Sequence, residues 1–127
     1  MGNAILEHIN VTVTDPTKTS DMLCSLFGWH IRWQGASLGD GKSIHVGTDD
    51  QYLAIYSHDA VKRNAGSSYA NSGGLNHIGV IVEDLDAIEK RVLDAGYETN
   101  NHGDYDPGRR FYFRDQDNIE FEVISYA

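Results

Sequence analysis

The sequence predicts an α+β fold built from two copies of a βαβββ module. The first observation is an internal repeat, in which His8 to Asp15 matches His77 to Asp84 at five of eight positions. The second is that each copy continues into a helical stretch that closes on a glycine, at Gly28 and Gly96. The third is that short β-like runs, separated by turn residues, follow each helical stretch. A duplicated unit accounts for all three observations.

Each copy of the repeat is expected to open as a strand. Apolar residues occupy every second position, which is typical of a strand with one buried face. If these residues pack under a helix, strand parity sends His8 and His77 to the opposite face of the sheet. The alternating apolar residues are Ile9, Val11 and Val13 in the first copy and Ile78, Val80 and Val82 in the second.

A helix is expected after each opening strand. The first runs from about Thr17 to Phe27, with Asp15 as its N-cap and Pro16 at the first helical position. The second runs from Leu85 to Ala95 and ends at Gly96. Its N-cap is either Asp84 or Asp86, and its apolar stripe is Leu85, Ile88, Val92 and Leu93.

Three further strands complete each module. In the first module they are expected at Trp29 to Gln34, Lys42 to Gly47 and Gln51 to Ser57; in the second, at Tyr97 to Thr99, Arg109 to Arg114 and Ile119 to Tyr126. The polar stretch between the modules has no periodicity and is interpreted as a linker, with a lid as the alternative. The chain is therefore predicted to be one domain, 1–127, with a first module at 1–58, a linker at 59–75 and a second module at 76–127.

Composition excludes several classes of partner. The chain has 127 residues, 40% of them hydrophobic, and a formal net charge of -9. Such a charge repels nucleic-acid phosphates and anionic lipid headgroups, so neither nucleic acid nor a membrane is expected as a partner. Cys24 is the only cysteine and cannot form an internal disulfide. With no leader-like segment or long apolar run, a cytoplasmic location is expected.

The residues that suggest chemistry are two histidines and a carboxylate. His8 and His77 stand at equivalent positions of the repeat, and Glu120 and Glu122 share one face of the last strand. Two imidazoles and one carboxylate can bind a divalent ion and leave positions open for substrate oxygens. Fe, Mn, Ni, Co and Zn all suit this ligand set. The competing interpretation is two unrelated strand histidines and a solvated carboxylate; the repeat favours a metal site.

The duplicated His-Ile-x-Val-x-Val-x-Asp motif and the segment from Arg110 to Val123 resemble the vicinal oxygen chelate superfamily, which includes glyoxalases, bleomycin-resistance proteins and extradiol dioxygenases. The resemblance covers almost the whole chain. It implies a cupped mixed β-sheet around one divalent metal, and a homodimer. It also implies His8, His77 and Glu122 as ligands, with Glu120 as the alternative carboxylate. Asn118 replaces the glycine usual at the turn before Glu122 and tolerates positive φ.

One departure from the family pattern argues against one of the reactions known in the family. Related glyoxalase isomerases have a fourth, acidic ligand. The matching position here is Ala54, or a neighbour if the register slips, and none of the residues from Tyr52 to Tyr56 is acidic. The resemblance therefore argues against glyoxalase-I isomerisation and leaves lyase, thiol transferase or dioxygenase chemistry on a small molecule. The alternative function is a metal-free, bleomycin-resistance-like protein that sequesters a ligand. The candidate substrate-binding residues are Arg110, Tyr112 and Tyr56.

Overall fold

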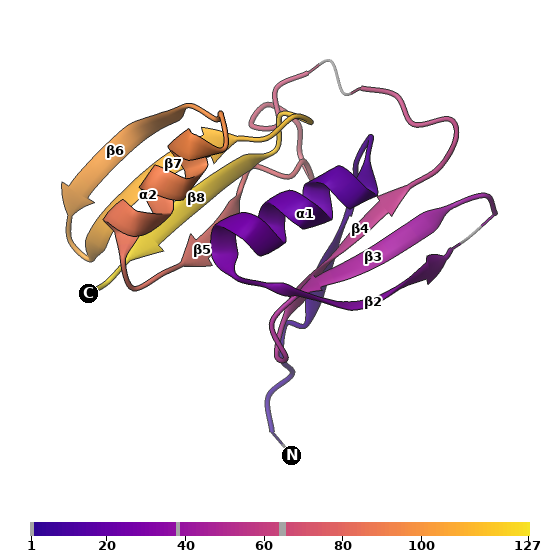
Figure 1. Cartoon of the computed structure of the whole chain (residues 1–127), viewed down its shortest axis with the longest axis horizontal. Helices are drawn as coiled ribbons and strands as arrows, with labels where there is room; N and C mark the ends of the chain where they lie inside the picture. Colours follow the sequence, from indigo (N-terminus) through magenta and orange to yellow (C-terminus); the bar gives the residue numbers. More distant parts are fainter. Residues whose placement is uncertain (1, 38, 64–65) are drawn as a thin grey trace. The chain divides into compact units, whose positions relative to one another are not determined.

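The chain folds into two compact units of the predicted kind (Figure 1). The computed structural model describes residues 2–37, 39–63 and 66–127. Unit 1 is Met1–Arg63 and unit 2 is Asn64–Ala127. Each unit runs in the order strand, helix, strand, strand, strand. The prediction of an α+β fold made of two βαβββ modules is confirmed.

Unit 1 contains a four-stranded mixed sheet in the order β1-β4-β3-β2. The first strand runs parallel to the last, and the other pairs are antiparallel. The helix packs against β3, β4 and β2. The elements are β1 (His8–Thr12), α1 (Pro16–Phe27), β2 (His30–Ala36), β3 (Lys42–Gly47) and β4 (Tyr52–Ser57).

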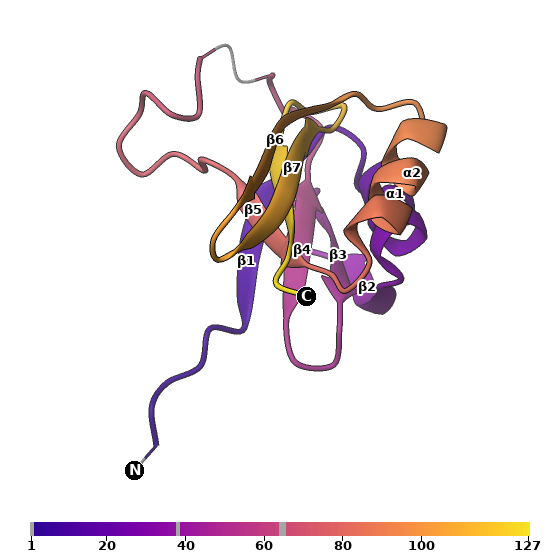
Figure 2. The same ribbon diagram turned by 90° about the vertical axis from the view of Figure 1, so that its left-hand side faces the viewer.

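Unit 2 repeats this architecture in the order β5-β8-β7-β6. Again the first strand is parallel to the last. Figure 2 shows α2 on one side of this sheet, where it packs against β7, β6 and β8. The elements are β5 (Ile78–Ile81), α2 (Leu85–Asp94), β6 (Thr99–Tyr105), β7 (Gly108–Arg114) and β8 (Glu120–Ser125).

The helix-facing side of each sheet forms the core of its unit. Val11 and Val13 are buried as the alternation predicts, whereas Ile9, at the start of its strand, is 40% exposed. In unit 2 an aromatic cluster forms the corresponding core, with the ring centres of Phe113 and Phe121 stacked 5.1 Å apart. The fully buried apolar side chains are Val13, Leu23, Leu26, Ile44, Val46 and Ile55 in unit 1 and Val92, Phe111, Phe113, Phe121 and Val123 in unit 2.

Strand pairing shows which positions of the two modules correspond. Gly79 pairs with Glu122 in unit 2, and Asn10 pairs with Ala54 at the same place in unit 1. Ala54 is therefore the counterpart of Glu122. Unit 1 has no carboxylate at the position where unit 2 has one, because an alanine stands there.

The helix boundaries follow the predicted capping residues. The Asp15 side chain accepts a hydrogen bond from Lys18 N, and α1 begins at Pro16. Of the two candidates for the second N-cap, Asp84 has the role, because its side chain accepts from Ala87 N. Gly28 closes α1 in the left-handed conformation, with φ at 70°.

Two details of the predicted second module are wrong. The third-from-last strand runs from Thr99 to Tyr105, and not from Tyr97 to Thr99. Its residues are mostly polar, so the sequence shows no strand pattern there. A register irregularity between Asn100 and Gly103 also interrupts its pairing. Leu93 is not part of the buried stripe of α2, since it is 51% exposed. The second strand of the first module runs from His30 to Ala36, and not from Trp29 to Gln34.

Replacing Gly28 by alanine is expected to lower the free energy of unfolding by about 1–2 kcal/mol. A Cβ at this position would meet nothing within 4 Å, so the cost is one of backbone conformation and not of crowding. Urea denaturation measures the change. Gly28→Asn is the control, and it is expected to cost less because asparagine tolerates positive φ. Equal losses in both variants would contradict this explanation.

Both described helices are short. α1 has 12 residues and α2 has 10. Among the described residues, no helix is both long enough and apolar enough to cross a membrane.

Candidate functional site

In unit 2, His77 and Glu122 face one another on the side of the sheet that the helix does not cover. His77 directly precedes β5, and Glu122 lies on the neighbouring strand β8. The distance from His77 Nε2 to Glu122 Oε1 is 3.2 Å. Gly79 pairs with Glu122, and a Cβ at Gly79 would lie 4.0 Å from Oε1. The glycine therefore leaves room beside the carboxylate.

Two residues of β7 hold the other oxygen of Glu122. Arg110 Nη1 donates to Oε2 at 2.9 Å, and the Tyr112 hydroxyl donates to the same oxygen at 3.1 Å. Burial, followed by the hydrogen bond to Glu122, raises the pKa of Tyr112, so its hydroxyl remains a donor at neutral pH. Oε2 is thereby fixed, and Oε1 is the oxygen directed to His77.

Arg110 keeps hydrogen-bonding capacity beyond this ion pair. Its guanidinium lies 4.7 Å from the centre of the Tyr105 ring. Within the described part of the chain, its Nε and Nη2 are buried and have no hydrogen-bond partner. Buried donors without a partner are costly, and an arginine fork suits a carboxylate or phosphonate. Both nitrogens are closed to solvent, and the guanidinium is engaged with Glu122 and the Tyr105 ring.

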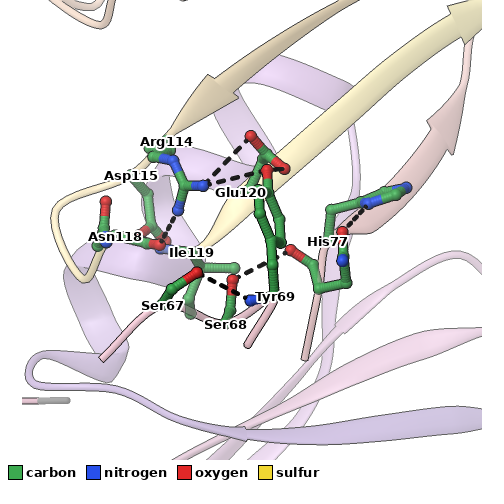
Figure 3. A network of polar contacts seen from close by, with 10 residues as sticks. Ser67, Ser68, Tyr69, His77, Arg114, Asp115, Asn118, Ile119 and Glu120 are labelled. Carbon is green, nitrogen blue, oxygen red and sulfur yellow. Dashed lines mark hydrogen bonds and ion pairs between the residues drawn. The ribbon is translucent and has the colours of Figure 1, made fainter. Parts of the chain in front are cut away.

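Glu120, the alternative carboxylate, is held by a different set of residues. It is 5% exposed and accepts a hydrogen bond from the hydroxyl of Tyr69. Arg114 Nη2 lies 3.4 Å from Glu120 Oε2 and also donates to the Tyr69 hydroxyl at 3.2 Å. Figure 3 shows the three side chains converging, with Tyr69 coming from the segment that precedes β5. The hydrogen bond to Glu120 raises the pKa of Tyr69.

In unit 1, His8 belongs to a row of aromatic side chains. Its ring stacks on Tyr52 at 4.9 Å, and Tyr52 stacks in turn on His45 at 4.6 Å. Glu7 Oε1 lies 2.9 Å from His8 Nδ1 and accepts from the Tyr52 hydroxyl at 3.2 Å. These hydrogen bonds lower the pKa of Glu7, while burial lowers the pKa of His45. Tyr52 was not identified from the sequence, because alternation alone does not reveal stacking across strands.

Tyr56, the third candidate for substrate binding, also lies in unit 1. It is half-buried on β4 opposite Thr12 and Ser43. Its ring is 5.7 Å from that of His58. The structure thus brings together Arg110, Tyr112, His77 and Glu122 in unit 2, and it describes His8 and Tyr56 separately, in unit 1.

The donor set in unit 2 fits a metal ion in part. Across residues 2–37, 39–63 and 66–127, no group of three or more His, Cys, Asp or Glu side chains lies ready to hold a metal. His77 and Glu122 do supply one nitrogen and one oxygen on the same side of the sheet. Ligating carboxylates and imidazoles are normally hydrogen-bonded through their remaining atoms, as Glu122 Oε2 is here. The pair therefore fits part of a divalent metal site.

Three solved structures resemble this fold over nearly all of their length. A glyoxylase/bleomycin resistance protein/dioxygenase domain from Frankia sp. EAN1pec is 22% identical, with 98% of each chain covered and a TM-score of 0.82. TnmS3, an antibiotic binding protein from Streptomyces sp. CB03234, is 19% identical, with 98% of each chain covered and a TM-score of 0.74. The fosfomycin resistance protein FosX from Listeria monocytogenes, complexed with Mn(II) and sulfate, is 20% identical, covering 98% of this chain and 93% of that one, with a TM-score of 0.70.

Comparison at the level of sequence gives the family. No curated protein sequence matches this chain significantly. The model of the Glyoxalase/Bleomycin resistance protein/Dioxygenase superfamily matches residues 5–123. The match includes both copies of the histidine repeat and the turn that precedes Glu122. The chain therefore belongs to the glyoxalase/bleomycin resistance protein/dioxygenase superfamily.

Proposed function

We propose that the protein is an enzyme that uses one divalent metal ion to bind adjacent oxygens of a small substrate. His8, His77 and Glu122 are the proposed ligands. The observation that carries the proposal is the 3.2 Å approach of His77 Nε2 to Glu122 Oε1, with Oε2 already engaged by Arg110 and Tyr112. His8 stands at the position of His77 in the first copy of the repeat, which supports it as the third ligand.

The ion would polarise substrate oxygens and stabilise negative charge that develops on them. The residues around it have separate tasks. Arg110 is the proposed partner of a carboxylate or phosphonate group of the substrate, because a guanidinium suits such an anion. Tyr112 holds Glu122 in place through its hydroxyl. Tyr56, in unit 1, is the third proposed substrate-binding residue.

The reaction is proposed to be of the lyase, thiol transferase or dioxygenase kind. An isomerase of the glyoxalase-I kind uses a fourth, acidic ligand that can move a substrate proton. The counterpart of Glu122 in unit 1 is Ala54, whose side chain can neither bind a metal nor accept a proton. Isomerisation is therefore not part of the proposal. A FosX structure similar in fold contains Mn(II), which supports a metal-dependent reaction of the other kinds.

The test is the metal content of the purified protein, measured by elemental mass spectrometry after incubation with Mn, Fe, Co, Ni or Zn salts. We expect about one ion per chain, and a loss of affinity of more than about 100-fold in His8→Ala, His77→Ala and Glu122→Gln, because removing a ligand should cost more than removing its hydrogen-bond partner. Glu120→Gln is the matched control and should keep the metal, since Glu120 is held by Tyr69 and Arg114.

Two outcomes would contradict the proposal. If Glu120→Gln loses the metal and Glu122→Gln keeps it, the carboxylate ligand is the wrong one. If the wild-type protein binds none of the five metals, the metalloenzyme proposal fails as a whole.

A second function, metal-free ligand sequestration, has one observation in its favour. Arg110 places a positive charge 2.9 Å from Glu122, so this carboxylate has a partner without any metal. The net charge of -9 suits a cationic ligand. TnmS3, whose fold is similar, is an antibiotic binding protein. Calorimetric titration with cationic antibiotics in the presence of a chelator would detect this function.

The oligomeric state, the substrate class and the location of the protein belong to the same proposed function. We propose a homodimer, because β1 and β5 lie at the edges of their sheets and the large side chains of Ile5, Leu6 and Ile81 are exposed. We also propose a small-molecule substrate and a cytoplasmic location.

A further inference from the structure

The guanidinium of Arg110 has a pair of donors that the fold closes off from water. Arg110 lies on β7, and its side chain is 13% exposed. Its Nη1 donates to Glu122 Oε2 at 2.9 Å. Within the described part of the chain, Nε and Nη2 are buried and have no hydrogen-bond partner. These two nitrogens lie on the same side of the guanidinium, so their N–H groups form a fork that suits two oxygens of one anion.

The ring of Tyr105 lies over this guanidinium. Tyr105 is the last residue of β6, the strand that pairs with β7, and the centre of its ring is 4.7 Å from Arg110 Cζ. Tyr105 is nevertheless 62% exposed. A cation–π contact at an exposed site contributes little free energy, so the ring is held weakly in this position.

Gly103 provides the space that the Tyr105 ring occupies. It pairs with Arg110 across β6 and β7. A Cβ at this position would lie 2.6 Å from Tyr105 Cε1 and 3.4 Å from Arg110 Cγ. Carbon atoms that are not bonded to each other prefer separations of about 3.5–4.0 Å, so a larger residue here would displace the ring. The glycine therefore permits the ring to lie over the arginine.

Unit 1 has the same glycine but no arginine beside it. Strand pairing makes Gly35 of β2 the counterpart of Gly103. A Cβ at Gly35 would lie 2.8 Å from Trp33 Cζ2, so an aromatic ring occupies the space here as well. The residue that pairs with Gly35 is Ser43, whereas Gly103 pairs with Arg110. A ring over the glycine is common to both modules, and a cation beside it belongs to unit 2.

The covered arrangement has a cost that an anion would remove. Two donors that face neither water nor an acceptor cost more free energy than an exposed cation–π contact gains. If the Tyr105 ring moved aside, an anion with two oxygens could satisfy both donors through charge-assisted hydrogen bonds. Glu122 would keep its own partner, because it accepts from Nη1 and not from the fork.

We propose that Tyr105 is a side-chain gate over Arg110, and that a carboxylate or phosphonate group of the substrate displaces the ring and binds Nε and Nη2. The inference rests on the proposed function, which makes Arg110 the partner of such a group. It requires no metal ion and is therefore testable in metal-free protein. It also explains Gly103, which permits the closed position of the gate.

The first experiment measures hydrogen exchange of the Arg110 Nε–H by ¹H–¹⁵N NMR, without any ligand. In wild type this proton should be protected, because Nε is closed to solvent. We expect exchange to be more than about 10-fold faster in Tyr105→Ala, which removes the ring, and in Gly103→Ala, which displaces it. Tyr105→Phe keeps the ring and should remain protected. Arg110→Lys identifies the signal by its loss.

The second experiment is a ³¹P NMR titration with methylphosphonate of protein that has been freed of metal by dialysis. We expect Tyr105→Ala and Gly103→Ala to bind about 10-fold more tightly than wild type, because they no longer lose the free energy of opening the gate. Arg110→Lys should bind at least about 10-fold more weakly, since a lysine has no fork.

Tyr126→Ala is the matched control for the second experiment. It removes a tyrosine of the same unit that is 56% exposed, and it should bind like wild type. Acetate is titrated in parallel by ¹³C NMR, and tighter binding of one anion identifies the group that the open fork prefers. Circular dichroism checks that each variant is folded.

The gate and the metal site can fail separately. The gate is overturned if the Nε–H exchanges as fast in wild type as in Tyr105→Ala, or if neither alanine variant at Gly103 or Tyr105 binds an anion more tightly than wild type. Undiminished binding by Arg110→Lys would also overturn it. If the exchange and anion results are as expected and wild type binds none of the five metals, the metalloenzyme proposal fails and the gate stands.

Discussion

Replacing Phe113 by alanine is expected to lower the free energy of unfolding by about 3–5 kcal/mol, the typical cost of truncating a fully buried phenylalanine. Phe113 has no exposed surface, and its ring stacks on that of Phe121 with an interplanar angle of 11°. The ring of Tyr97 is tilted against that of Phe113, with the two ring centres 5.8 Å apart. Since Phe113, Phe121 and Tyr97 belong to three different segments, the space left by the ring cannot close without moving the sheet.

Urea denaturation followed by circular dichroism measures this loss. The control is Leu93→Ala, which truncates an apolar residue of the same unit that is 51% exposed and should change stability by less than about 0.5 kcal/mol. Both tryptophans, Trp29 and Trp33, lie in unit 1, so their fluorescence reports whether that unit is affected by a change in unit 2. A loss below about 1 kcal/mol in Phe113→Ala would contradict the packing described for this core.

The stability of the protein is expected to fall as the pH rises from about 4 to 7 through the titration of Asp115. Asp115 is 7% exposed, and burial raises its pKa from the ordinary 3.8 to about 6. Its Oδ1 accepts from the backbone nitrogens of Asp117 and Ile119. Its Oδ2 is buried and, among the described residues, has no hydrogen-bond partner. The charged form is therefore poorly solvated in the folded state.

The sign of the effect follows from proton binding. Between pH 3.8 and about 6 the folded state holds this proton and the unfolded state has released it, so unfolding becomes easier with rising pH. The whole difference corresponds to about 3 kcal/mol, and about half of it falls between roughly pH 5 and pH 7.5. Stability from this group is complete below the unfolded pKa and is lost above the folded one.

Asp115→Asn isolates this contribution from those of other titrating groups. The amide oxygen can accept the same two backbone hydrogen bonds, and the side chain has no charge to bury. We expect the free energy of unfolding of wild type, minus that of the variant, to fall by about 1.5 kcal/mol between pH 5 and pH 7.5. Urea denaturation at several pH values measures it. A difference that is constant with pH would contradict the raised pKa of Asp115.

The elements that were predictable from the sequence depend on short-range patterns. The alternation around Val11 and Val80 gave the opening strands, because the period of a strand is two residues. Asp15 and Asp84 marked the helix starts, because a side-chain acceptor satisfies backbone donors within three residues. The positive φ of Asn118 was also predictable, since few residues other than glycine tolerate that conformation.

Strand β6 was less predictable because its stability does not come from its own sequence. Residues such as Asn100, Asn101 and Gly103 have low strand propensity, and Asn101 adopts a positive φ of 52°. The segment is a strand because β7 pairs with it on both sides of the irregularity between Asn100 and Gly103. A pattern within one segment does not contain that information.

The same distinction, between a pattern within one segment and contacts between segments, applies to the candidate site residues. The repeat alone singled out His8 and His77, and alternation alone put Glu120 and Glu122 on one face of the last strand. Alternation cannot distinguish two residues of the same parity. Their different surroundings come from contacts distant in sequence: Tyr69 and Arg114 engage Glu120, whereas Arg110 and Tyr112 engage Glu122 and leave one oxygen for His77. A periodic pattern assigns a residue to a face of the sheet, but the partners of its side chain depend on which strands and loops the fold places next to it.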